Sequence, residues 1–241
     1  MNDNATAEAL AKAIHEGQRS IPAERPLMVR KPKKIESWRI FKIMAEFIEG
    51  FDIISRYGLA VSIFGSARDV YEKSVYDSAT ELASRLAKKG VAIITGGSAG
   101  VMEAANKGAF EAGGVSVGLN INLPEAQKYN PYLTDQFGFD HFFVRKVMFT
   151  YASEAYVYFP GGLGTLNEFF EIVALVQTKK IRKIPIVLFG REFWMPLIGF
   201  IEKTLYKKYG AIDEKDTQLY KLVDSVDEAY EYIAEHIFHQ N

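Results

Sequence analysis

The chain contains no cysteine among its 241 residues. This absence excludes disulfide bonds, a thiolate nucleophile and every metal site with cysteine ligands, and it is typical of a reducing compartment. The segment Met1–Gly17 is polar and no apolar run reaches about 18 residues, so we expect neither a secretory signal nor a membrane span. We therefore expect a cytoplasmic protein.

An excess of positive charge is also missing, since 29 lysines and arginines stand against 30 aspartates and glutamates. Proteins that coat nucleic acid are usually strongly basic, so we expect no nucleic-acid partner and a local pocket for any bound phosphate. The histidines show no metal-ligand spacing, and the G-x-S-x-G motif of serine hydrolases does not occur. We expect neither a metal ion nor a cofactor.

Hydrophobic residues make up 48% of the chain and charged residues 24%, an ordinary globular mixture that can bury a core. Residues 1–35 are predicted to be an N-terminal extension that is partly flexible and holds several prolines and a short basic run at 30–34. We interpret this run as part of a solvated linker rather than as a contact with nucleic acid or lipid. Residues 36–241 are predicted to form a single domain.

Within this domain, apolar strands alternate with amphipathic helices. The predicted strands cover residues 59–64, 91–95, 115–119, 139–144, 154–159, 184–189 and 219–223, and the predicted helices cover 37–57, 74–89, 99–112, 165–177, 193–209 and 226–238. This alternation is typical of a parallel sheet that is covered on both faces. The predicted fold class is α/β: a Rossmann-like, doubly wound, mostly parallel sheet whose ligand binds beyond the carboxyl ends of the strands.

Three predicted strands end in glycine-rich turns, Gly65–Arg68, Gly96–Gly100 and Gly161–Thr165. Glycines allow close backbone approach, and free N–H groups at a helix start bind anions. Any single tight turn favours glycine, but three on one sheet favour a nucleotide. None has the dinucleotide fingerprint or the G-x-x-x-x-G-K-[S/T] phosphate loop, which argues against NAD binding and ATP hydrolysis.

The stretch Thr165–Glu168 matches a helix capping box, in which Thr165 caps the helix and Glu168 reaches back to it. The functional alternative is that Thr165 and the glycine amides hold a phosphate while Glu168 points into a cleft, ionised because of the helix dipole. The predicted buried stripe of this helix consists of Leu166, Phe169, Phe170, Val173 and Val176. Glu168 and Glu171 lie off this stripe and face water or a cleft.

Arg145 and Lys146 follow the predicted strand 139–144 and open a predicted helix. Cations at a helix N-terminus interact unfavourably with the helix dipole. An unfavourable placement of this kind at the end of a strand indicates a functional site. The alternative is that both cations pair with surface carboxylates. We favour the functional interpretation, more for Arg145 than for Lys146.

These residues resemble the Lonely guy (LOG) family. Pro160–Glu168 matches the family signature PGGxGTxxE, Arg145 and Lys146 stand where the family carries an arginine–lysine pair, and residues 96–109 resemble its second glycine-rich loop and helix. The resemblance covers roughly residues 59–190. Many members are labelled "possible lysine decarboxylase", but such decarboxylases need pyridoxal phosphate on a lysine, and nothing in the sequence indicates that site.

The resemblance implies a homodimeric phosphoribohydrolase that releases the base from cytokinin riboside 5′-monophosphates or AMP. It implies that Arg145 and Glu168 are the catalytic pair and that the third glycine loop holds the phosphate. The candidate substrate-binding residues are Gly65, Ser66, Arg68, Gly96, Gly97, Gly100, Met102, Lys146, Gly161, Gly162, Gly164 and Thr165.

The sequence departs from the family at two places. The second loop reads Gly-Gly-Ser-Ala where the family often has Gly-Gly-Gly-Pro, and Ala126, next to Glu125, stands where the longer branch commonly has glutamate. Both departures bear on ribose or base contacts. A non-catalytic nucleotide carrier or sensor stays open as an alternative function, and so does the choice between adenine and a modified adenine.

Overall fold

The computed structural model describes residues 37–68, 72–122 and 129–238. The predicted linker and its basic run, together with Glu125 and Ala126, lie outside the described residues. The internal contacts of the chain divide it into two units, Met1–Ile40 and Phe41–Asn241. All the strands lie in the second unit.

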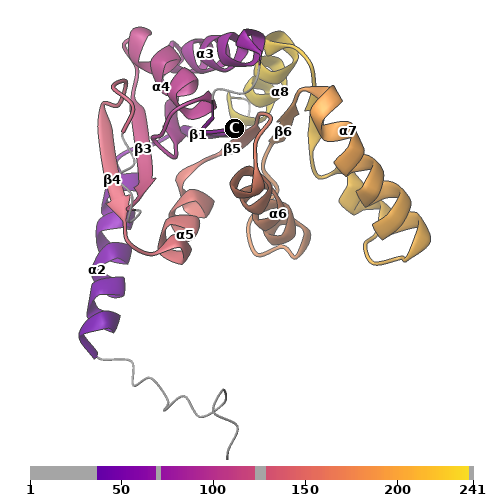
Figure 1. Cartoon of the computed structure of the whole chain (residues 1–241), viewed down its shortest axis with the longest axis horizontal. Coiled ribbons are helices and arrows are strands. Elements are labelled where there is room, and N and C mark those ends of the chain that lie inside the picture. The colour runs from indigo at the N-terminus through magenta and orange to yellow at the C-terminus, as the bar shows by residue number, and fades with distance from the viewer. Residues whose placement is uncertain (1–36, 69–71, 123–128, 239–241) are drawn as a thin grey trace, which may run out of the picture. The chain divides into compact units, whose positions relative to one another are not determined.

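A seven-stranded sheet forms the centre of this unit (Figure 1). The strands are β1 Ala60–Phe64, β2 Ala92–Thr95, β3 Ser116–Ile121, β4 Asp135–Phe139, β5 Ala155–Tyr158, β6 Ile186–Phe189 and β7 Lys221–Val223. Their order is β4-β3-β2-β1-β5-β6-β7, and every neighbouring pair is parallel. The strand order therefore reverses between β1 and β5, which is where open α/β sheets bind ligands.

Helices cover both faces of the sheet, which confirms the Rossmann-like α/β prediction. One apolar core lies under α3 Lys73–Ala87, α4 Val101–Glu111 and α8 Val226–Phe238. The other lies under α2 Ser37–Ile54, α5 Phe142–Ala152, α6 Leu163–Gln177 and α7 Arg191–Phe200. A π-helical stretch, Ile201–Lys208, continues α7, and a 3₁₀ turn, Glu214–Gln218, precedes β7. Among the described residues, no helix is both long and apolar enough to cross a bilayer.

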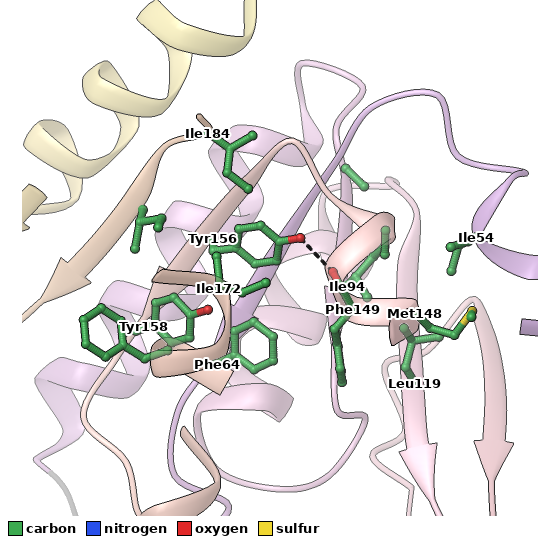
Figure 2. Close-up of a cluster of buried hydrophobic side chains, with 14 of the residues drawn as sticks. Ile54, Phe64, Ile94, Leu119, Met148, Phe149, Tyr156, Tyr158, Ile172 and Ile184 are labelled. Carbon is green, nitrogen blue, oxygen red and sulfur yellow. Dashed lines mark hydrogen bonds between the residues drawn. The ribbon is translucent and has the colours of Figure 1, made fainter. Parts of the chain in front are cut away.

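The central strands are buried on both faces, so their sequences are mostly apolar rather than alternating, with Ser62 and Thr95 as buried polar exceptions. Ala155 and Val157 of β5 pack under α3, α4 and α8, whereas Tyr156 and Tyr158 point to the opposite face. Figure 2 shows Tyr156 and Tyr158 among the side chains of this second core. Each hydroxyl donates a hydrogen bond to the backbone of a covering helix, so these large polar rings are accommodated without an unsatisfied group.

The predicted strand at residues 139–144 is wrong. β4 ends at Phe139, and α5 begins at Phe142. The apolar run suggested a buried strand, but Phe142 and Phe143 are 56% and 50% exposed. The helix instead buries Val144, Met148 and Ala152, which follow one another at four-residue spacing.

Candidate active site

A cavity of about 610 Å³ lies beyond the carboxyl ends of β1, β2 and β5. All three glycine loops border it. The cavity is lined by Phe64, Gly65, Ser66, Ala67, Arg68, Gly96, Ser98, Met102, Ile121, Phe142, Arg145, Phe149, Gly162, Leu163, Gly164, Thr165 and Glu168. The sheet thus gathers backbone N–H groups, two arginines and one carboxylate around a single space.

The three loops are joined to one another through Ser66. Its backbone N–H donates to the carbonyl of Pro160 at 3.0 Å, and its carbonyl accepts from the N–H of Val101 at 3.0 Å. Gly100 has a φ of 68° and lies so close to the Ser66 carbonyl that a β-carbon would clash with it. Glycine is therefore required at position 100, and it couples the first loop to the second.

A buried network of polar side chains holds the second glycine loop in place. Thr95 Oγ1 donates to Asn106 Oδ1 at 2.6 Å and accepts from the N–H of Gly97 at 2.9 Å. Asn130 Nδ2 donates to the same Asn106 oxygen and to the carbonyl of Ser98. Asn106 and Asn130 were not among the residues predicted from the sequence to form the site. An amide within the buried face of a helix, as at Asn106, is the signal that could have indicated such a network.

The third loop contradicts the predicted capping box. α6 begins at Leu163 with Gly162 as its N-cap, and no side chain caps it. The helix starts two residues earlier than predicted, and the buried Thr165 side chain packs against Gly161 instead of capping. Glu168 consequently lies in the second turn and lines the cavity. The capping role that competed with a functional role for Glu168 is therefore absent.

The predicted buried stripe of α6 needs one correction as well. Phe169 and Val176 are buried as predicted, but Phe170 is 41% exposed and Ile172 takes its place in the core. The buried residues of α6 follow one another at three- and four-residue intervals. Two adjacent phenylalanines cannot both lie on such a face, and only Phe169 does.

Arg145 enters the cavity from α5 in a fixed orientation. Its Nε donates to the carbonyl of Leu119 at 2.7 Å, and its guanidinium lies 5.1 Å from the ring centroid of Phe149. The guanidinium group lies directly against Gly96, where the β-carbon of any other residue would clash with it. Burial lowers the pKa of Arg145 to about 10, although the nearby Glu168 carboxylate raises it. Arg145 is therefore a cation at neutral pH.

Burial raises the pKa of Glu168 to about 7, and Arg145 opposes this shift by favouring the carboxylate. We predicted an ionised glutamate at the start of a helix, but Glu168 lies beyond the first turn, where the dipole acts less strongly. Both protonation states are thus populated near neutral pH. A carboxyl group with such a pKa suits proton transfer or the stabilisation of a developing cation.

The other predicted binding residues fall into two groups. Gly65, Ser66, Arg68, Gly96, Met102, Gly162, Gly164 and Thr165 line the cavity. Gly97, Gly100, Gly161 and Lys146 do not: the glycines pack against Asn120, Ser66 and Thr165, and Lys146 Nζ lies 2.6 Å from Glu171 Oε2. An apolar part of the wall was not predicted from the sequence; it is formed by Phe64, Ile121, Phe142, Phe149 and Leu163.

The described residues contain no group of three or more histidine, cysteine, aspartate or glutamate side chains arranged to hold a metal ion. The chemistry available to the cavity from the chain itself consists of N–H donors, hydroxyl groups, the two arginines and Glu168.

The model of the family described as "Possible lysine decarboxylase" matches residues 102–233, more than half of the chain. The chain belongs to this family. It is the family of the LOG proteins, and the match includes the α5 and α6 segments that carry Arg145 and Glu168.

Two curated relatives extend this assignment. An uncharacterized protein of Archaeoglobus fulgidus is 32% identical over 129 residues, which are 52% of this chain and 82% of the relative. The cytokinin riboside 5′-monophosphate phosphoribohydrolase of Rhodococcoides fascians is 28% identical over 122 residues, 48% of this chain and 61% of the relative. The matched region thus spans about three fifths of the Rhodococcoides enzyme.

Among solved structures, the molybdenum cofactor carrier protein of Chlamydomonas reinhardtii has a TM-score of 0.57 and 23% sequence identity. The likeness covers 75% of this chain and 98% of the carrier. It confirms the fold of this LOG-family chain.

Proposed function

We propose that this LOG-family protein hydrolyses the N-glycosidic bond of a nucleoside 5′-monophosphate, AMP or a cytokinin riboside monophosphate, to free base and ribose 5-phosphate. The observation that carries the proposal is the position of Arg145 and Glu168 in one cavity with three glycine loops. The phosphoribohydrolase relative in Rhodococcoides fascians supports it.

The 5′-phosphate binds at the N-terminus of α6 in this proposal. Gly162 and Gly164 present backbone N–H groups there without side chains to block the approach, and Thr165 adds a hydroxyl. The positive end of the helix dipole favours the anion. The apolar wall, with Phe142 and Phe149, takes the base.

Glu168 and Arg145 act at the two sides of the bond that breaks. Cleavage leaves positive charge on the ribose ring, and an ionised Glu168 stabilises that charge and orients the attacking water. The electron pair of the bond leaves with the base. Arg145, a cation held by its bond to the Leu119 carbonyl, offsets the negative charge that develops there or positions the substrate.

A non-catalytic nucleotide carrier is the second candidate. The structural likeness to a molybdenum cofactor carrier protein favours it, because that protein has the same fold and is named as a carrier rather than as an enzyme. The two candidates differ in what they require of Glu168. A carrier of an anionic ligand gains nothing from a carboxylate in its cavity, whereas the hydrolase depends on it.

The decisive experiment incubates the protein with a panel of nucleoside monophosphates that includes AMP and N6-prenylated AMP. Free base and ribose 5-phosphate are measured by chromatography. We expect release by the wild type and a loss of about 100-fold or more in Glu168→Gln, since the substitution removes the charge but keeps the shape.

Glu111→Gln is the matched control, because Glu111 is an exposed glutamate at the end of α4 that does not line the cavity. It should keep full activity. Undiminished turnover in Glu168→Gln contradicts the role of Glu168. Tight nucleotide binding by the wild type in calorimetry, without any release of base, establishes the carrier instead.

A further inference from the structure

An ion pair links the two helices that carry the proposed catalytic residues. Lys146 of α5 is the neighbour of Arg145, and Glu171 of α6 lies three residues beyond Glu168. Lys146 Nζ is 2.6 Å from Glu171 Oε2, and the two side chains are only 25% and 27% exposed. An ion pair this shielded is screened less by solvent than one on an open surface.

Two cations of α5 therefore meet two carboxylates of α6, but in different ways. Lys146 and Glu171 are in direct contact, whereas Arg145 directs its Nε to the Leu119 carbonyl and lines the cavity together with Glu168. Within the described chain, Arg145 and Glu168 form no ion pair with each other. Arg145 and Glu168 therefore both face a substrate in the cavity, whereas Lys146 and Glu171 neutralise each other.

We propose that Lys146 and Glu171 are positioning residues, whose ion pair fixes α5 against α6 and so holds Arg145 and Glu168 at the separation that the scissile bond requires. The proposal rests on the proposed hydrolysis. It assigns Lys146, which the resemblance to the family made a candidate substrate ligand, to the support of the site. Precise placement matters because small displacements of reacting groups cost large factors in rate.

The same pair contributes to the charge environment of Glu168. Glu171 raises the pKa of Glu168 and Lys146 lowers it, in addition to the larger effects of burial and Arg145. The charged and titratable groups around Glu168 are Arg68, which also lines the cavity, Arg145 and Lys146 of α5, Glu171 of α6, and the phenols of Tyr156 and Tyr158 of β5. Both phenols have a raised pKa and stay neutral.

The kinetics and pH profiles of two variants distinguish a positioning role from a purely structural one. Lys146→Met and Glu171→Gln both break the ion pair, and each should lower kcat by roughly tenfold with little change in KM. Their pH profiles should move in opposite directions. The acid limb of kcat/KM moves to higher pH in Lys146→Met, because Glu171 remains unpaired, and to lower pH in Glu171→Gln.

Arg85→Met is the matched control. Arg85 Nη1 lies 2.5 Å from Asp227 Oδ1, links α3 to α8, and has a side chain that is 30% exposed, but it does not line the cavity. Its loss should lower the melting temperature and leave kcat and the pH profile unchanged. The exchange Lys146→Glu with Glu171→Lys should recover activity relative to either single reversal.

The outcomes separate the two proposals. A wild-type protein that releases no base from any nucleotide overturns the proposed hydrolysis. An active wild type, with Lys146→Met and Glu171→Gln that behave as Arg85→Met does, overturns the positioning role alone. Opposite shifts of the acid limb, together with recovery in the exchanged protein, support it.

Discussion

At the scale of single residues, Glu168 is held between opposing influences. Burial disfavours its charge and raises its pKa to about 7, while Arg145 on the neighbouring helix favours the charged form. A glutamate in water ionises well below pH 7, so the folded chain binds a proton that the unfolded chain has released. The active-site geometry thus costs stability at neutral and alkaline pH.

This cost predicts that Glu168→Gln is more stable than the wild type at pH 8, by roughly 1–3 kcal/mol. The sign follows from the raised pKa: the stabilising protonated form is fully present below the unfolded pKa and is lost as the pH rises through about 7. Urea unfolding at pH 8 and pH 4 measures the difference. At pH 4 the two proteins should agree, and a wild type that is the more stable at pH 8 contradicts the inferred burial.

The motif and the expected position of Arg145 at the start of a helix made Arg145 and Glu168 candidates in the sequence. The second expectation was wrong, because α5 begins three residues earlier, at Phe142. The sequence could not identify the partner of Lys146, because a contact between α5 and α6 depends on how two helices pack on the sheet. The capping box failed for a related reason. Thr165 has the right spacing to Glu168, but α6 begins two residues before Thr165, at Leu163, with Gly162 as its N-cap.

At the scale of elements, β5 supports the two helices of the candidate site. The hydroxyl of Tyr156 donates to the carbonyls of Phe149 and Thr150 near the end of α5, at 2.8 Å each. The hydroxyl of Tyr158 donates to the carbonyl of Glu168 in α6, at 3.2 Å. Figure 2 shows both rings on the same face of the strand, with the Tyr156 bond to Phe149 as a dashed line. One strand therefore places the helices of Arg145 and Glu168 relative to the sheet.

The two tyrosines offer a matched pair of substitutions. Tyr158→Phe removes the bond to the residue that we propose as catalytic, so we expect kcat to fall severalfold. Tyr156→Phe removes the bonds to Phe149 and Thr150, about one turn beyond Arg145, and should cost about 1 kcal/mol of stability with little loss of kcat. Steady-state kinetics and thermal unfolding of both variants provide the comparison. Equal kinetic losses in the two variants would contradict a specific role for Tyr158.

The order and type of most elements followed from hydrophobic period, because parallel strands buried on both faces are short apolar runs between helices. One exception was β4, of which only Phe139 lay within a predicted strand. The other was the segment Phe142–Val144, whose consecutive apolar residues fit a strand equally well. Phe142 lines the cavity and Phe143 is half exposed, so neither side chain lies on the buried face of α5. The helical spacing of apolar residues indicates only that buried face.

At the scale of the whole molecule, apolar side chains gather on the outer surface of α2 and α5. Phe41, Met44, Ile48 and Phe51 recur at three- and four-residue spacing on α2, and all are at least 42% exposed. The ring of Phe51 lies 5.8 Å from that of Tyr151 on α5, so the apolar surface continues from one helix to the next. Monomeric proteins rarely expose apolar patches that extend over several such residues.

We therefore expect two copies of the chain to associate through this α2–α5 surface, in agreement with the dimer that the family resemblance implies. A two-fold axis lets the same patch on each copy cover that of the other, which is the usual arrangement in homodimers.

Ile48→Lys should convert the dimer to a monomer, because it introduces a charge at a position that is 69% exposed and loses little packing within the chain. Tyr209→Lys, at a residue 65% exposed beyond the π-helical stretch, is the control and should stay dimeric. Light scattering coupled to size-exclusion chromatography distinguishes the states, and a monomeric wild type or a dimeric Ile48→Lys contradicts this interface.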